Sequence, residues 1–230
     1  MKHINTYISE KLIISKNKPS KNRKYTLFPK SKDELKEMIK DEIKQNGYEC
    51  DLNHIDTSNI TVMDSLFYKS SFNGDISEWD VSKVEDMSYM FYYSEFNGDI
   101  SDWDVSNVED MAYMFTYSSF NNDISQWDVS SVINMHSMFL NNKSFNNDIS
   151  QWDISSVEDM SYMFGGSNFN KDIGGWDVSN VEYMNEMFSS SQFNKDISKW
   201  KISSNCKTIG MFYNSIIKDK YRPYKNSERL

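Results

Sequence analysis

The sequence is poor in the residues that most often carry chemistry. Its three histidines, His3, His54 and His136, are scattered, and none lies at zinc-ligand spacing from another histidine or a cysteine. It has no glycine-rich phosphate loop, no Gly-x-Ser-x-Gly motif and no arguable Cys/His nucleophile pair. We therefore expect a protein that is not an enzyme and that uses no cofactor.

Cysteine and long apolar runs are also scarce. The two cysteines, Cys50 and Cys206, lie near opposite ends of the chain, so one disulfide would have to span it, and we expect free thiols. No run of about 18 apolar residues exists, which argues against a membrane span. Residues 1–10 contain no apolar signal-peptide core, so we expect a cytoplasmic or virion-associated protein rather than a secreted one.

Acidic residues dominate the middle of the chain, and the net charge is −9. Residues 72–200 hold 22 acidic and 5 basic residues, a balance of −17, whereas residues 1–71 and 201–230 carry +3 and +5. An acidic body with basic ends disfavours nucleic-acid binding along that body. With 38% hydrophobic and 15% aromatic residues, the composition is that of a folded chain.

What the sequence has in abundance is one repeated unit. All six tryptophans occupy the same place in it, with successive gaps of 24, 24, 25, 24 and 24 residues. A fixed period in this range indicates a solenoid, in which each turn contacts only its neighbours. The six are Trp79, Trp103, Trp127, Trp152, Trp176 and Trp200.

The chain divides into a row of repeated turns and flanking segments that we interpret as caps and linkers. Residues 1–24 combine an amphipathic stretch with a basic linker, and they are either a short docked helix or an attachment peptide. Residues 25–50 read as an N-terminal cap, with a helix that starts after the capping serine Ser31. Residues 51–212 form seven turns, the first and last of them degenerate, and residues 213–230 read as a loosely ordered basic tail.

Within one unit the spacing of the apolar residues changes from a strand pattern to a helical pattern. Ile100, Trp103 and Val105 have the L-x-x-L-x-L spacing of leucine-rich repeats, which predicts a short parallel strand with Asp104 facing outward. Residues 106–115 then follow with helical spacing and a capping box, which predicts a short helical or 3₁₀ segment. The expected fold class is an α/β repeat: a leucine-rich-repeat-like solenoid of short parallel strands and short helical segments behind an N-terminal capping helix.

The unit FNGDISDWDVSNVEDMAYMF at residues 96–115 resembles the repeat of the BspA-like leucine-rich-repeat family, which includes bacterial surface proteins and mycoplasma proteins of unassigned function. The resemblance covers roughly residues 51–212. It implies a leucine-rich-repeat solenoid with a binding or adhesive role and no catalytic residues. Similar repeats in bacteriophages of gut bacteria make a phage-encoded member a further option.

The sequence offers one polar constellation as a candidate site, a row of side chains on the outward face of the expected sheet. Its members are Asp80, Asp104, Asp128, Asp153 and Asp177, with Glu78, Asp102, Gln126 and Gln151 one column over. Three interpretations are open: locally hydrogen-bonded or solvated carboxylates, a recognition face for a basic partner, and a row of Ca²⁺ ions. The spacing disfavours the last, because it is not the glycine-rich calcium repeat.

These observations favour a non-catalytic module that recognises another protein through its sheet face or its ends. The alternatives are a structural component of a larger assembly such as a phage particle, docked by residues 1–24, and a surface adhesin. An adhesin would need export, for which the sequence shows no signal.

Overall fold

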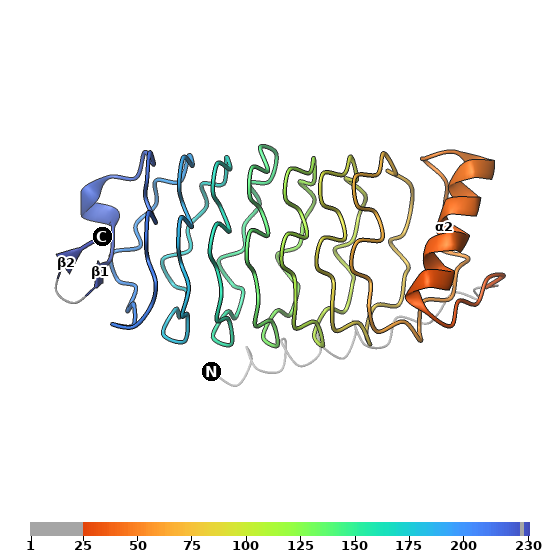
Figure 1. Ribbon diagram of the computed structural model, residues 1–230, viewed down its shortest axis with the longest axis horizontal. Helices are drawn as coiled ribbons and strands as arrows, with labels where there is room; N and C mark the ends of the chain where they lie inside the picture. Colours follow the sequence, from red (N-terminus) through yellow and green to blue (C-terminus); the bar gives the residue numbers. More distant parts are fainter. Residues whose placement is uncertain (1–24, 226–227) are drawn as a thin grey trace, which may run out of the picture.

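The computed structural model describes residues 25–225 and 228–230. They form a row of similar turns, with helix α2 (Lys32–Asn46) at its N-terminal end (Figure 1). At the other end lie the 3₁₀ helix η1 (Asp219–Tyr221) and the antiparallel pair β1 (Tyr224–Lys225) and β2 (Glu228–Arg229). The expected attachment peptide and linker, residues 1–24, fall outside the described residues.

Helix α2 starts where the sequence predicts a cap. The Ser31 hydroxyl accepts a hydrogen bond from the Glu34 amide at 3.2 Å, and the Glu34 carboxylate accepts one from the Lys30 amide at 2.8 Å. These bonds satisfy amides that have no partner inside the helix. The helix ends at Gly47, whose φ of 86° lies in the left-handed region that glycine adopts without strain.

One hydrogen bond recurs at all six tryptophans. The Trp127 indole N–H donates to the main-chain carbonyl oxygen of Ile100, in the preceding turn, at 3.0 Å. Each tryptophan is only 3 to 5% exposed, so an unpaired indole N–H would carry a desolvation cost that this bond removes. The other donors and acceptors, at 3.0 to 3.2 Å, are Trp79 with Leu52, Trp103 with Ile76, Trp152 with Ile124, Trp176 with Ile149 and Trp200 with Ile173.

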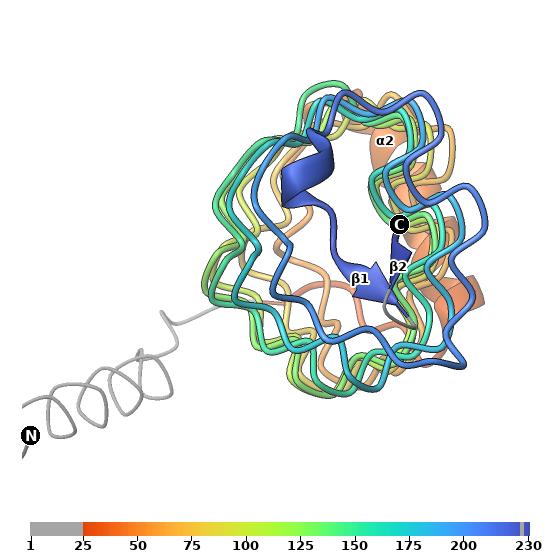
Figure 2. The ribbon, with the colours of Figure 1, turned by 90° about the vertical axis from the view of Figure 1, so that its left-hand side faces the viewer.

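Columns of phenylalanine fill the interior, around which the turns superpose into one outline (Figure 2). The ring of Phe115 lies 5.6 Å from those of Phe91 and Phe139 in the neighbouring turns, with the planes nearly parallel. A second column runs beside it, in which Phe96 and Phe120 lie 6.4 Å apart. Every unit therefore adds one layer of aromatic rings to a continuous core.

Asparagine side chains connect the corners of neighbouring turns. The Asn97 side-chain oxygen accepts the backbone N–H of Asn121 at 2.8 Å, and Asn73 accepts that of Asn97 at the same distance. The bond continues through Asn146, Asn170 and Asn194. This ladder accounts for the asparagine that follows phenylalanine in the regular units.

The segment expected to form strands, residues 103–105 in one unit, has the predicted pattern of buried and exposed side chains, but its backbone does not form the predicted strand. Trp103 and Val105 are buried and Asp104 is exposed, so the inward orientation of the tryptophan is confirmed. The Trp103 amide, however, donates to the Ile100 carbonyl three residues back at 3.2 Å. The segment thus begins with a tight turn, and within the described residues parallel bridges form at this place only at the two ends of the row, between Leu27 and Ile55 and between Lys201 and Tyr224.

Pairing between turns occurs later in each unit. Isolated parallel bridges join Asp86 to Asp110 and Asp110 to Asn134, in a column that runs from Val62 to Lys207. Short main-chain contacts of this kind hold the turns in register without a continuous sheet.

The short helices expected after each strand are replaced by turns. No helical residue occurs in the described chain between α2 and η1. The amides of Met114, Thr116 and Ser118 each donate to the carbonyl three residues back at 3.2 Å, which makes three overlapping β-turns.

A sideways hydrogen-bond ladder explains why these turns do not become a helix. The amides of Tyr113 and Phe115 donate to carbonyls in the next turn of the row at 2.8 and 2.9 Å, instead of four residues back along the chain. Tyr113 and Tyr117 have φ angles of 59° and 55°, in the left-handed region that a right-handed helix excludes.

The C-terminal residues, expected as a loosely ordered tail, lie across the last turn instead. Ile217 is 3% exposed, and the Ile197 amide donates to the Tyr221 carbonyl at 3.0 Å. The Arg222 guanidinium lies 5.2 Å from the Phe212 ring centroid. The apolar edge of the final turn requires a cover, and these residues provide it.

Replacing Trp127 separates the packing of the indole from its hydrogen bond. We expect Trp127→Ala to lower the free energy of unfolding by about 3–5 kcal/mol, because it leaves a cavity in the core. Trp127→Phe keeps most of the ring but removes the indole donor, so the Ile100 carbonyl retains only the Trp103 amide as a donor, and the lost hydrogen bond should cost about 0.5–1.5 kcal/mol. Urea unfolding followed by circular dichroism measures both changes, and a Trp127→Phe variant as stable as wild type would contradict the role of the bond.

Candidate functional site

The aspartates predicted as a site do form an exposed row. Each accepts hydrogen bonds from the serine two residues later: the Asp104 carboxylate accepts the Ser106 amide at 3.2 Å and the Ser106 hydroxyl at 2.6 Å. The same pattern holds at Asp80, Asp128 and Asp153, and Asp177 accepts the amide of its serine. One oxygen of each carboxylate is thus engaged in local turn structure.

The neighbouring column is polar and partly engaged as well. Gln126 and Gln151 are exposed and donate to the serine before each at 3.2 and 3.3 Å. Asp102 is exposed, whereas Glu78 is half-buried and its backbone amide donates to Asn53 at 2.8 Å. All nine predicted residues thus lie on the segments that flank the tryptophans.

Serine bonding keeps part of this row charged. The side-chain and backbone hydrogen bonds from Ser155 lower the pKa of Asp153, and those from Ser179 lower the pKa of Asp177. A carboxylate held by such bonds favours its ionised form. The row is therefore an acidic surface at neutral pH.

A second surface, which the sequence interpretation missed, is built from tyrosines on the segment with the overlapping β-turns. Tyr93 is 59% exposed, Tyr117 48% and Tyr68 42%. The Tyr89 and Tyr113 rings stack at 4.4 Å, and those of Tyr93 and Tyr117 lie 5.7 Å apart. We call this surface the tyrosine face; its members are Tyr68, Tyr89, Tyr92, Tyr93, Tyr113 and Tyr117.

The backbone explains how these rings reach the surface. Tyr89, Tyr93, Tyr113 and Tyr117 all have φ angles between 54° and 59°. This conformation costs a residue other than glycine about 1–2 kcal/mol. The other turns repeat this conformation at the equivalent positions with a mixture of residues, which are Ser65, Lys69, Ser137, Asn141, Tyr162, Gly166, Glu186, Ser190, Gly210 and Asn214.

The aromatic strip continues past the tyrosine face and becomes polar. The His136 ring lies 4.9 Å from the Tyr113 ring, and its Nδ1 lies 3.4 Å from the Asp159 carboxylate. Tyr162 donates its hydroxyl proton to Glu186 at 2.9 Å, and this bond raises the pKa of Tyr162.

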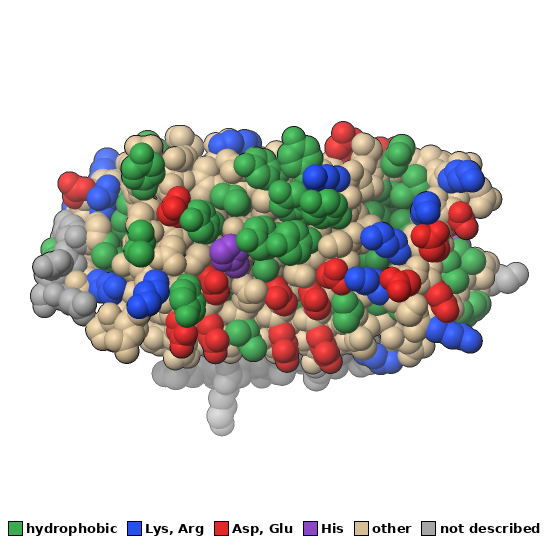
Figure 3. All heavy atoms as spheres, viewed as in Figure 1, with side chains coloured by type: hydrophobic (Ala, Val, Ile, Leu, Met, Phe, Trp, Pro, Cys, Tyr) green, Lys and Arg blue, Asp and Glu red, His purple; other side chains and the backbone are tan. Residues whose placement is uncertain are grey.

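Acidic side chains border the tyrosine face along one side. Glu85, Glu109, Glu158 and Glu182 are exposed and succeed one another in a column that Ile133 interrupts. Beside it the half-buried Asp110 accepts the Ala112 amide at 2.7 Å, and burial raises the pKa of Asp110. Figure 3 shows hydrophobic side chains, tyrosine included, gathered over the middle of the row with acidic side chains beneath them.

A recurrent offset could have revealed the tyrosine face. Tyr89 and Tyr113 are 24 residues apart, as are Tyr93 and Tyr117. The helical interpretation of Met-x-x-Met-Phe hid the signal, because it assigned these positions to an ordinary solvated helix face.

The structure also locates the groups that could serve chemistry. Burial raises the pKa of the Cys206 thiol to about 11, so this thiol is protonated at neutral pH. Within the part of the chain that the structure describes, no three His, Cys, Asp or Glu side chains come together in a way that could hold a metal ion. In that same part, no helix has the length and apolar character needed to span a bilayer.

Comparison with known proteins gives one match. The family model described as Mycoplasma protein of unknown function, DUF285, matches residues 33–125 and 116–222. No curated protein and no solved structure matches the chain.

The bonding of Asp153 predicts a pH-dependent effect. Its pKa is lowered in the folded state, so the ionised carboxylate stabilises the fold above the ordinary pKa of 3.8, and this contribution disappears as the pH falls through the folded pKa. For an exposed group the contribution is screened by solvent, to less than about 1 kcal/mol. We expect Asp153→Ala to lower the melting temperature at pH 7 and the difference from wild type to shrink below pH 3.8.

Differential scanning calorimetry from pH 7 to pH 3 measures this difference. A deficit of the Asp153→Ala variant that stays constant over that range would show that the serine bonds do not favour the ionised carboxylate.

Proposed function

The chain belongs to the DUF285 family, the BspA-like repeat family of Mycoplasma proteins of unknown function, and we propose that it is a non-catalytic recognition module. In this proposal the stacked turns are a leucine-rich-repeat-like solenoid that binds another protein through the tyrosine face. The observation that carries it is the placement of four large aromatic side chains at left-handed backbone positions on adjacent turns.

Core packing does not account for those tyrosines. Tyr93 and Tyr117 are about half exposed, and the same positions elsewhere in the row hold Asn141 and Gly166. Asparagine and glycine tolerate positive φ with less strain than tyrosine. A strained conformation that exposes a large ring favours a role at the surface over a role in stability.

Tyrosine suits a binding surface because its ring offers a large contact area with few rotatable bonds. Tyrosines are enriched among the residues that contribute most to protein–protein affinity. Here their backbone is held by inter-turn hydrogen bonds of 2.8 to 2.9 Å at Tyr89, Tyr93, Tyr113 and Tyr117. Binding would therefore require little further ordering of the main chain.

The charge around the tyrosine face indicates the chemistry of the partner. The exposed carboxylates of Glu85 and Glu109 lie on the segments that lead into it, and residues 72–200 carry a balance of −17. A basic segment with arginine fits best, because a guanidinium both stacks on aromatic rings and pairs with carboxylates. A nucleic acid would be repelled by the same charge.

A fourfold variant tests this proposal without disturbing the fold. We replace Tyr89 and Tyr113 with serine and Tyr93 and Tyr117 with asparagine, which are the residues that Ser137 and Asn141 supply at the equivalent positions. Because the row already accommodates this pair, we expect cooperative unfolding and a free energy of unfolding within about 2 kcal/mol of wild type. Affinity for the partner, captured from the native source and purified, should fall at least about tenfold.

The matched control is Asp80→Asn together with Asp104→Asn, a change on the predicted aspartate row, and it should retain binding. Wild-type affinity should also weaken as ionic strength rises. If the fourfold variant binds as wild type does while removal of residues 1–24 abolishes capture, the protein is better described as a component of a larger assembly docked through its N-terminus.

A further inference from the structure

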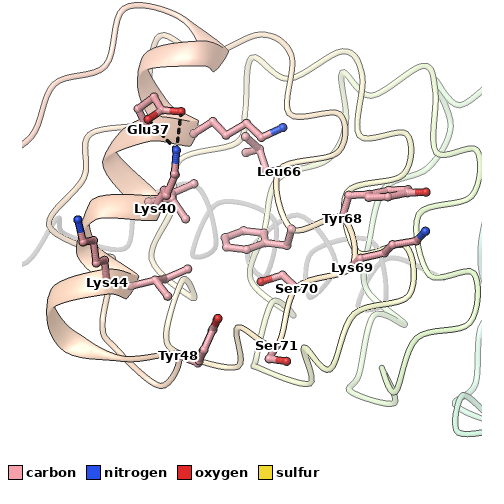
Figure 4. A pocket seen from close by; sticks show the side chains of 13 residues that line it. Glu37, Lys40, Lys44, Tyr48, Leu66, Tyr68, Lys69, Ser70 and Ser71 are labelled. Carbon is pink, nitrogen blue, oxygen red and sulfur yellow. Dashed lines mark hydrogen bonds and ion pairs between the residues drawn. The ribbon is translucent and has the colours of Figure 1, made fainter.

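A groove separates α2 from the first turn of the row, at the N-terminal end of the tyrosine face (Figure 4). Its volume is about 800 Å³, large enough for several side chains of a bound molecule. Helix α2 forms one wall, and the segment from Leu66 to Ser71 forms the other. Tyr68 belongs both to this groove and to the tyrosine face, so the two surfaces are continuous.

The helix wall carries a row of positive charge. Lys36, Lys40 and Lys44 stand four residues apart, so they lie along one side of α2, and all three are exposed and line the groove. Lys69 lines the opposite wall, and its ammonium group extends away from α2 and lies 5.2 Å from the Tyr68 ring centroid (Figure 4). Glu37, which pairs with Lys40 at 3.3 Å, is the one carboxylate among the lining residues.

The floor of the groove is apolar. Ile39 and Phe67 are nearly fully buried at its base, and Ile43 is half-buried one helical turn further on. Among the residues of α2 only Leu35 and Ile39 are fully buried, so the C-terminal half of the helix packs less closely on the first turn. Tyr48, 54% exposed, closes the end of the groove near Ser71.

We propose that this groove binds an acidic peptide segment of a partner protein, with apolar side chains on the floor and carboxylates against the lysine row. Charge complementarity selects this occupant, because the lining residues include four lysines and a single glutamate, whereas residues 72–200 of the same chain carry a balance of −17. The chain's own residues 1–24 are a poor occupant, because they carry seven Lys or Arg and one Glu. The proposal is independent of the basic partner assigned to the tyrosine face.

Fluorescence anisotropy with the full chain tests this assignment. The probe is a fluorescein-labelled 12-residue peptide of glutamate and leucine residues, compared with the same peptide in which serine replaces leucine. We expect saturable one-to-one binding of the leucine peptide, weakened by salt, and at least about tenfold weaker binding of the serine peptide. Equal binding of the two peptides would overturn the proposal, because it would leave only a nonspecific positive surface.

Substitutions of the lysines on α2 test whether the peptide binds in the groove. Lys40→Glu with Lys44→Glu should weaken the leucine peptide at least about tenfold, and the neutral set Lys36→Gln, Lys40→Gln and Lys44→Gln should do the same with the helix intact by circular dichroism. The matched control is Lys195→Glu with Lys199→Glu, two exposed lysines also four residues apart, and it should change affinity less than twofold.

Two results would contradict the site. The first is equal loss of binding in the control pair, which would indicate a general charge effect. The second is a 12-residue oligothymidylate that binds as tightly as the peptide with the same lysine dependence, which would make the groove a nucleic-acid site.

Discussion

The rest of the structure depends on one interaction, the hydrogen bond from each buried indole N–H to a main-chain carbonyl of the preceding turn. A short unit of this kind cannot bury its own apolar side chains, so it is stable only against a neighbour. The indole meets this need in two ways, since its rings add apolar area to the shared core and its buried N–H finds an acceptor in the neighbouring turn. The phenylalanine columns and the asparagine ladder also join neighbouring turns. The phenylalanines do so by stacking their rings, and the asparagines do so by accepting backbone N–H groups. Every turn is thereby fixed in position relative to the next, although no continuous strand links them.

Because these contacts hold the turns together, the outward side chains of one segment in each turn can differ from turn to turn. The overlapping β-turns after the first methionine are held by main-chain bonds to the next turn, and these bonds are the same whichever side chain points outward. Position 137 holds serine and position 113 holds tyrosine on the same backbone. Four tyrosines on two adjacent turns, with glutamates beside them, make a surface of one chemical character, whereas the equivalent positions of the other turns hold a mixture of residues. The lysine groove next to α2 has the opposite charge at the end of the same surface. A chain whose long body is acidic thus presents two surfaces of different chemical character side by side.

Much of this arrangement could be predicted from the sequence, and the failures have a common cause. The period of the tryptophans predicted the stacked turns, and the alternation of Trp103, Asp104 and Val105 predicted which side chains are buried. The helical interpretation of residues 106–115 was wrong, because Met-x-x-Met-Phe has helical spacing while its amides donate sideways, and a sequence shows spacing but not the direction of a hydrogen bond. The tyrosine face was missed for the same reason, since residue spacing does not show the positive φ at Tyr113 and Tyr117 that accompanies the sideways bonding. The aspartate row was correctly placed at the surface, and its serine partners were recognisable only once the turns were known. The C-terminal cover depended on one apolar residue, Ile217, in an otherwise polar segment.

Buried indole hydrogen bonds join each regular turn to the one before it. Hydrogen exchange of the six indole N–H groups, followed by nuclear magnetic resonance, tests it most directly. We expect slow exchange at Trp103, Trp127, Trp152 and Trp176, on the order of 10³-fold slower than at a solvent-exposed indole, because these protons exchange only when the row opens. Rapid exchange at Trp127 in a folded protein would contradict it, since an indole proton in the middle of the row would then be free of its carbonyl.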